Sequence, residues 1–119
     1  MKLIVTSQGP EATDPVDPRF GRAPYFLVCD VETGGFTALD NRDQAAAAQG
    51  AGVQAAQIVA GSGAQIVLTG HCGPKAFAVL SEAGLQVYAG ATGSVQDAVH
   101  AWYEGKLELL ATPDGIPHH

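Results

Sequence analysis

Short apolar runs alternate with longer stretches of helical spacing along the chain. Runs of four to eight residues that are rich in Val, Ile, Phe and Tyr are typical of β-strands. The tetrapeptide Glu32-Thr33-Gly34-Gly35 separates two of these runs, which favours a β-hairpin. We therefore predict strands over residues 2–6, 25–31, 36–40, 65–69 and 85–88.

Two stretches in the middle of the chain predict helices. Residues 44–60 carry apolar side chains at spacings of three and four, which indicates one helical face. Gly50 and Gly52 within that stretch each disfavour the helix by about 1 kcal/mol relative to Ala. The second helix is expected over residues 74–83, because Pro74 suits the first helical position.

A third helix is expected near the C-terminus. Ser94 and Asp97 have the spacing of a capping box, and Gly105 is a stop signal. Beyond it, residues 107–110 form either a final edge strand or a packed part of a C-terminal tail at 106–119. His118 and His119 at the end of that tail are given no function.

The order of these elements predicts the fold class. Strands and helices alternate in the second half, which requires right-handed crossovers and a parallel centre of the sheet. The hairpin adds an antiparallel strand, so we expect one α/β domain over residues 1–119, with three layers and a mixed sheet of about five strands. Residues 8–19 contain three prolines and three acidic residues, and they predict a mobile loop.

Composition narrows the class of protein. Leu, Ile, Val and Phe make up 28 of the 119 residues, which is above the level of disordered chains. The net charge of −6 excludes a basic nucleic-acid-binding surface. No signal peptide or membrane span is recognisable, so we expect a soluble, cytoplasmic protein without nucleic-acid or membrane partners. Cys29 and Cys72 alone supply neither a disulfide framework nor a four-cysteine metal site.

Charge is nearly absent from the middle of the chain. Residues 44–96 contain only Lys75 and Glu82 as charged residues. This pattern is typical of a buried βαβ core, and it is also compatible with an apolar ligand pocket.

Glycine-rich loops follow three of the predicted strands, at residues 7–9, 70–74 and 89–93. Because ligands of open α/β sheets bind beyond the carboxyl ends of parallel strands, we expect these loops to meet there. Pro74 leaves the N–H groups of Lys75 and Ala76 without helical partners, and helix N-termini of this kind attract anions.

His71 and Cys72 are adjacent and supply a pair of soft ligands. Such a pair suits Cu(I), Zn or the edge of a sulfide cluster. The alternative is a hydrogen-bonded histidine beside a small buried thiol. We place Cys29, which lies within a predicted strand, in the core, and His100 on a helix surface.

Arg19-Phe20-Gly21-Arg22 places two guanidinium groups around a Phe and a Gly. In an acidic protein this favours binding of an anion. The alternative is that both arginines pair with Glu11, Asp14 or Asp17.

Catalytic motifs are missing from the sequence. It contains neither Gly-x-Ser-x-Gly nor a Walker loop, and the first predicted strand carries no carboxylate for a two-metal nuclease site. We therefore expect that the protein is not an enzyme.

Three segments resemble the dinitrogenase iron–molybdenum cofactor biosynthesis family. The first contains the FGRAPYF signature, and the resemblance spans about residues 1–105. The segments are Arg19–Asp30, Ala51–Ala56 and Thr69–Phe77.

The resemblance implies a ribonuclease-H-like fold without nuclease activity and a role with metal–sulfur clusters of molybdenum or iron. The length and acidity are similar to a branch that holds a mixed molybdenum–copper sulfide cluster noncovalently. Many members have His where this chain has Arg19, which argues against metal ligation at that position and favours charge complementarity.

These arguments converge on noncovalent binding of an anionic metal–sulfur cluster for storage, delivery or assembly, with a possible protein partner that receives it. The cluster is of the molybdenum–copper sulfide type or of an iron–molybdenum or iron–sulfur type. An adaptor domain in which metal is incidental is the alternative, and an enzyme acting on a small anion with His71 as base is a weaker one. The predicted cofactor-binding residues are Arg19, Phe20, Gly21, Arg22, Gly70, His71, Cys72, Gly73, Pro74 and Lys75, with His71 and Cys72 as candidate metal ligands.

Overall fold

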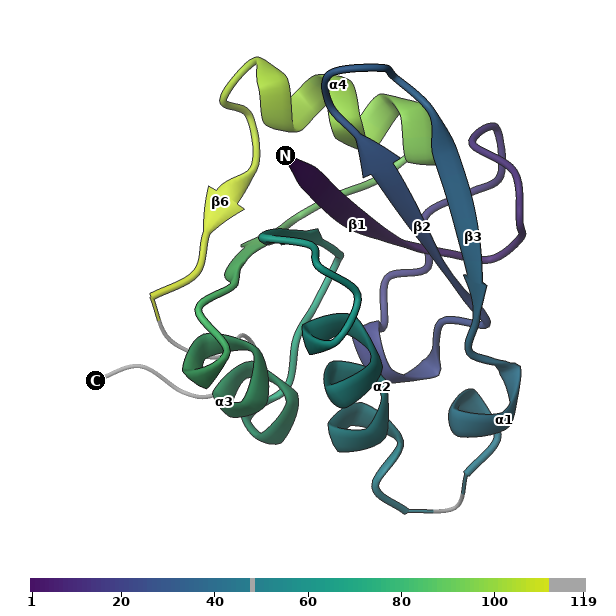
Figure 1. The fold of residues 1–119 in the computed structure, drawn as a ribbon, viewed down its shortest axis with the longest axis vertical. Coiled ribbons are helices and arrows are strands. Elements are labelled where there is room, and N and C mark those ends of the chain that lie inside the picture. Colours follow the sequence, from purple (N-terminus) through teal and green to yellow (C-terminus); the bar gives the residue numbers. More distant parts are fainter. Residues whose placement is uncertain (48, 112–119) are drawn as a thin grey trace.

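A six-stranded mixed sheet runs through the computed structural model, which describes residues 1–47 and 49–111 (Figure 1). The strand order is β3-β2-β1-β4-β5-β6. β1, β4 and β5 are parallel, whereas β2, β3 and β6 run antiparallel to their neighbours. The strands are β1 (Lys2–Ser7), β2 (Tyr25–Asp30), β3 (Phe36–Asp40), β4 (Ile66–Leu68), β5 (Gln86–Ala89) and β6 (Glu108–Leu109).

Helices cover both faces of the sheet, which gives the predicted three layers. α2 and α3 lie on one face, whereas α4 lies on the other (Figure 1). β1 shows how the period of two builds both cores, because Ile4 packs in the α2 and α3 layer while Leu3 and Val5 pack with α4. The helices are η1 (Phe20–Arg22, a 3-10 turn), α1 (Arg42–Ala45), α2 (Ala51–Ala60), α3 (Pro74–Glu82) and α4 (Val95–Tyr103).

Two of the sequence predictions about these elements need correction. The sheet has six strands instead of about five, because Glu108–Leu109 pairs with β5 as a short final strand. The single helix predicted over 44–60 is two helices, α1 and α2. Gly50 breaks the stretch with a left-handed φ of 75°, which glycine adopts at little cost, and α2 starts at the next residue. The ribonuclease-H-like label stays a prediction.

The loop at 8–19 is tied to its surroundings by backbone hydrogen bonds. The Val16 N–H donates to the Gly93 carbonyl, and the Val95 N–H donates to the Asp14 carbonyl. Val16 is buried in the core on the α4 side. Mobility of this loop stays a prediction, and these contacts oppose it.

Within the described residues, the structure contains no helix with the length and hydropathy that crossing a membrane requires. The predicted tail at 106–119 is described only as far as residue 111, where it includes β6. His118 and His119 lie outside the described residues.

Candidate anion-binding site

One surface cavity gathers most of the predicted site residues. Its volume is about 640 Å³, and its walls come from η1, from the start of α2 and from the start of α3. These three segments lie far apart in the sequence. The lining residues are Arg19, Phe20, Gly21, Arg22, Gln49, Gly50, Ala51, Gly52, Val53, His71, Gly73, Pro74, Lys75 and Ala76.

Two helix N-termini open into this cavity. Gly50 is the N-cap of α2 and Gly73 is the N-cap of α3, and neither residue has a side chain that could cap its helix. The first N–H groups of an α-helix have no intrahelical acceptor. Their partial positive charge therefore faces the cavity from two directions, which favours an anion.

Glycines allow the cavity walls to come together. A Cβ on Gly21 would lie 2.7 Å from the Cα of Gly52, so a side chain there would separate η1 from α2. Gly52 in turn lies against Ala76, because a Cβ on Gly52 would be 3.6 Å from the Cβ of Ala76. The backbones of η1 and α2 therefore meet at this point without an intervening side chain, and the small Ala76 side chain of α3 packs beside them.

The cations of the site differ in how they are held. The Arg19 guanidinium is 67% exposed, and its Nε lies 3.7 Å from Asp17 Oδ1. Arg22 instead donates from Nη1 to the carbonyls of Ala45 (2.8 Å) and Ala47 (2.7 Å), so it ties η1 to α1. Lys75 is exposed in the first turn of α3. Among the described residues that line the cavity, none is Asp or Glu.

Backbone hydrogen bonds fix the two loops that carry Arg19 and His71. The His71 N–H donates to the Pro18 carbonyl (2.7 Å), and the Phe20 N–H donates to the His71 carbonyl (3.2 Å). Gly70 allows this contact, because a Cβ there would lie 2.7 Å from the Pro18 Cα.

Asp17 is the one charged side chain in the buried part of the described chain, and it accepts a hydrogen bond from the Arg19 N–H. The open question about the two arginines is therefore resolved differently for each. Arg19 lies beside Asp17, whereas Arg22 bonds to backbone carbonyls.

The side chains of His71 and Cys72 lie in different environments, although the two residues are adjacent in the sequence. His71 is exposed and lines the cavity, whereas Cys72 is fully buried in the core and does not line it. Gly70 is also buried outside the cavity wall. The geometry therefore gives no support to ligation by the Cys72 thiol or to ligand contact by Gly70. Cys29 is buried as predicted, and burial and then the neighbouring Asp30 raise the pKa of its thiol.

The donor set decides what kind of group fits the cavity. No cluster of three or more His, Cys, Asp or Glu side chains that could ligate a metal ion occurs among the described residues. The cavity offers N–H donors, the three exposed cations Arg19, Arg22 and Lys75, and apolar walls instead. This chemistry fits an anion of low charge density that is held noncovalently.

Sequence reasoning located two of the three walls. The predicted convergence of loops was only partly right, because residues 7–9 and 89–93 do not line the cavity. The missed wall is the start of α2 from Gln49 to Val53. Gly50 was its signal, because a glycine before an apolar helical stretch can provide a helix start as well as weaken a longer helix.

Comparisons with known proteins agree on one family. Residues 1–105 match the family model described as dinitrogenase iron-molybdenum cofactor. The apo form of the orange protein from Desulfovibrio gigas has a similar structure, with a TM-score of 0.90, 41% identity and 95% of each chain covered. The NMR structure of a NifB-like protein from Thermotoga has a TM-score of 0.82 and 34% identity, over 93% of this chain and 94% of that one.

A curated relative extends the comparison to an archaeon. An uncharacterized protein of Methanocaldococcus jannaschii is 30% identical over 95 residues, which are 78% of this chain and 80% of that protein. The family description and the structural neighbours indicate a role related to a metal cofactor. With a match that spans nearly the whole described fold, this chain belongs to the dinitrogenase iron-molybdenum cofactor family.

Proposed function

We propose that the protein binds a polyanionic metal–sulfur cluster as cargo in the cavity between η1, α2 and α3 and carries it for storage, delivery or assembly. The observation that supports this best is the convergence of two open helix N-termini and three exposed cations on one cavity without a carboxylate in its described lining. The role is non-catalytic. The cargo is a molybdenum cluster with copper or iron, or an iron–sulfur cluster, and a partner protein receives it.

The physical argument concerns charge density. Sulfide-rich clusters spread their negative charge over large, weakly hydrated faces, so apolar walls and N–H donors suit them better than a tight ring of ligands. Arg19 and Lys75 would hold the charge, the first turns of α2 and α3 would donate N–H groups, and Val53 and Pro74 would supply apolar contact. Because neither His71 nor Cys72 has to bind metal, the cargo could leave without breaking a protein–metal bond.

Reconstitution tests the proposal directly. The protein is mixed anaerobically with tetrathiomolybdate and Cu(I), and in parallel with iron and sulfide, and each sample is desalted. We expect a coloured band that co-elutes with stoichiometric metal from one of the two mixtures. Colourless, metal-free protein from both mixtures would reject the proposal and favour the adaptor function.

A pair of charge reversals distinguishes binding in this cavity from a general effect of the protein's net charge. Lys75→Glu places an acid in the cavity, whereas Lys106→Glu makes the same change of net charge at a residue that pairs with Glu104 outside the cavity. We expect Lys75→Glu to weaken cluster retention about tenfold, which corresponds to about 1.4 kcal/mol, and Lys106→Glu to leave it near the parent value. Equal losses in both variants would show that net charge, not this cavity, controls binding.

A further inference from the structure

The two edges of the sheet differ in a way that the proposed function does not explain. At one edge, β6 is only two residues long and carries Glu108. At the other edge, β3 is a regular strand of five residues without Pro, Lys or a bulge (Figure 1). Natural proteins usually protect edge strands with such features, because an unprotected edge pairs readily with another chain.

The hydrogen-bond register shows which groups of β3 face outward. The Asp30 N–H donates to the Gly35 carbonyl, and the Asn41 N–H donates to the Pro24 carbonyl. Because antiparallel bonds repeat every second residue, Thr37 and Leu39 bond to β2 between these two points. The N–H and C=O groups of Phe36, Ala38 and Asp40 therefore point away from the sheet, and the described part of the chain records no partner for them.

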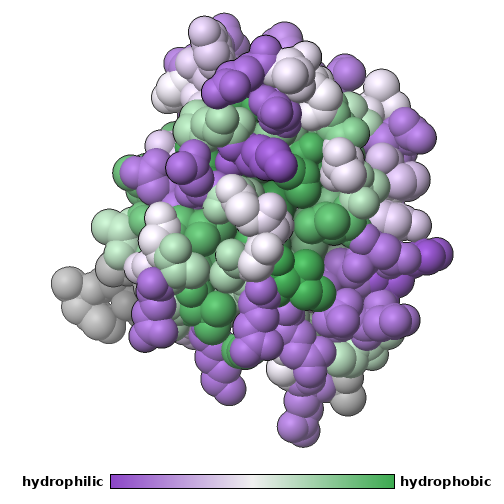
Figure 2. Space-filling model, viewed as in Figure 1, coloured by the Kyte–Doolittle hydropathy of each residue, from purple (hydrophilic) through white to green (hydrophobic). Residues whose placement is uncertain are grey.

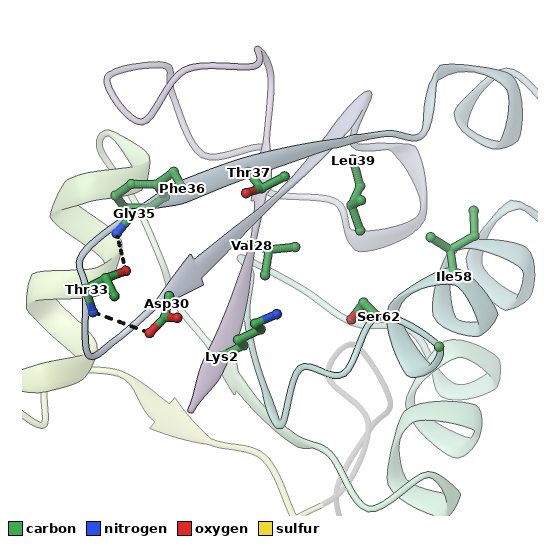
Figure 3. Close-up of a pocket in the computed structure, with 11 residues that line it drawn as sticks. Lys2, Val28, Asp30, Thr33, Gly35, Phe36, Thr37, Leu39, Ile58 and Ser62 are labelled. Atoms are coloured by element: carbon green, nitrogen blue, oxygen red, sulfur yellow. Dashed lines mark hydrogen bonds between the residues drawn. The ribbon is translucent and has the colours of Figure 1, made fainter.

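The side-chain surface beside this edge is partly apolar. A groove of about 580 Å³ lies between β3 and α2, and Val28, Leu39 and Ile58 point into it (Figure 3). Figure 2 shows hydrophobic residues gathered in the middle of this face, with hydrophilic residues around them. An added strand would therefore find both free backbone groups and apolar contact.

The charge of the edge indicates what could pair with it. Asp40 is the only charged residue of β3, and its carboxylate binds the Arg42 guanidinium at 2.7 Å. The strand edge is thus close to neutral, although the whole chain carries −6. A strongly basic partner would find little to bind here, whereas a second copy would meet no like charge at the centre of the strand.

We propose that β3 pairs antiparallel with β3 of a second copy of this chain, about a twofold axis at Ala38. This register sets Ala38 opposite Ala38 of the second copy and Phe36 opposite Asp40. Every outward-facing residue then meets an outward-facing residue, which gives about six backbone hydrogen bonds. The two Asp40 side chains stay at opposite ends, and Ala38 allows close approach at the centre. On the groove side, Leu39 of each copy lies across from Thr37 of the other.

The size of the contact predicts a weak dimer. One pair of five-residue strands lies at the small end of specific interfaces, so the dimer should form reversibly at high concentration. Sedimentation equilibrium of the full chain from about 10 μM to about 1 mM should show a rising average mass. Amide exchange of Ala38 should slow over the same range, while the Ala38 N–H of the monomer stays open to water.

Charge-swapped variants test the register itself. Ala38 is exposed, so Ala38→Lys and Ala38→Glu should both fold, which circular dichroism checks. Each variant alone should stay monomeric, because like charges would face each other across the axis. An equimolar mixture should recover the dimer. The pairing is overturned if the parent stays monomeric up to about 1 mM, or if both variants dimerise as the parent does.

A backbone variant gives a second, independent test. Ala38→Pro removes an N–H that points outward and takes no part in the ladder with β2, so the monomer should keep its fold. We expect this variant to lose the dimer at every concentration. A dimer that survives this substitution would place the contact elsewhere on the molecule. None of these measurements uses the metal cluster, so they stand or fall separately from the proposed function.

Discussion

The start of α4 and the starts of α2 and α3 show two treatments of the same physical problem. At α4, the Ser94 hydroxyl accepts from the Asp97 N–H, and the Asp97 carboxylate accepts from the Ser94 N–H. At α2 and α3, glycine occupies the N-cap and leaves the first N–H groups to the cavity. The capping box therefore gives N–H groups at the start of α4 side-chain acceptors within the chain. The difference indicates that a helix start without a side-chain cap leaves its N–H groups available to bind a ligand.

The largest expected effect comes from disturbing how the open starts are brought together. Gly21→Ala would place a Cβ against the backbone of Gly52, so we expect a loss of about 1–3 kcal/mol in the free energy of unfolding. Cluster retention should fall as well, because η1 would move away from α2. Chemical denaturation measures the first effect and reconstitution the second. Gly61→Ala is the matched control, because a Cβ there would make only ordinary contacts, the nearest at 3.6 Å, and Gly61 does not line the cavity; an equal loss there would contradict the close-packing argument.

Converting an open start into a capped one should separate stability from binding. Gly73→Asp adds a capping carboxylate to α3, and the extended backbone of Gly73 accommodates it. We expect the free energy of unfolding to rise by a few tenths of a kcal/mol. Cluster retention should fall about tenfold, since the new acid occupies and neutralises the helix start.

Gly73→Asn is the control for that change, because it supplies a similar cap without the charge. It should keep more of the cluster than Gly73→Asp does. If both variants bind the cluster as the parent does, the start of α3 takes no part in binding.

Converting the capped start of α4 into an open one should lower stability and leave cluster retention unchanged. Ser94→Ala removes the cap of α4 and should cost about 1 kcal/mol in the free energy of unfolding. Cluster retention should stay at the parent value, because Ser94 does not line the cavity. Thermal denaturation and reconstitution of the same sample provide both readouts. A variant that keeps its stability but loses cluster would reverse the roles of the two kinds of helix start.

The smallest effect concerns pH. The hydrogen bonds from Ser94, first from its backbone and then from its side chain, lower the pKa of Asp97. A carboxyl whose pKa is lower in the folded state stabilises the fold above its unfolded pKa of about 4, and this contribution is lost as the pH falls through the folded value. Denaturant midpoints of the parent should therefore fall more steeply with acid than those of Asp97→Asn. Parallel curves would show that the α4 cap has no charged component. Asp40 provides a comparison, because Arg42 lowers its pKa to about 2. The Asp40 carboxylate should therefore stay ionised over most of the pH range below about 4 in which this titration is followed.

The sequence predicted the layers and strands well because their patterns are local. β1, β3 and α4 follow directly from a short β-rich run, a hairpin turn and a capping box. The break between α1 and α2 was missed because alanines continue the helical pattern beyond Ala45, where α1 ends, and the left-handed backbone of Gly50 then precedes the start of α2. β6 was left open because two residues contain too little pattern to identify a strand.

The parts of the candidate site that could be predicted are those in which charged residues and a recognisable motif occur in the same short segment. Arg19–Arg22 and Gly73–Lys75 were both expected at the site and both line the cavity. The start of α2 was not assigned to it, because contact between Gly21 and Gly52 depends on tertiary packing over thirty intervening residues. The burial of Cys72 was equally hidden, since nothing in a His-Cys dipeptide states which side chain faces water.

The contrast between an acidic molecule and a cavity without carboxylates has a kinetic consequence. A polyanion approaching this protein meets net repulsion from the acidic chain, and attraction near Arg19, Arg22, Lys75 and the two helix starts. Such a field discourages unproductive encounters and guides the ligand to one entrance, so the association rate should depend on where the charges lie more than on their sum. A carrier built in this way can be selective in what it captures even though it holds its cargo loosely.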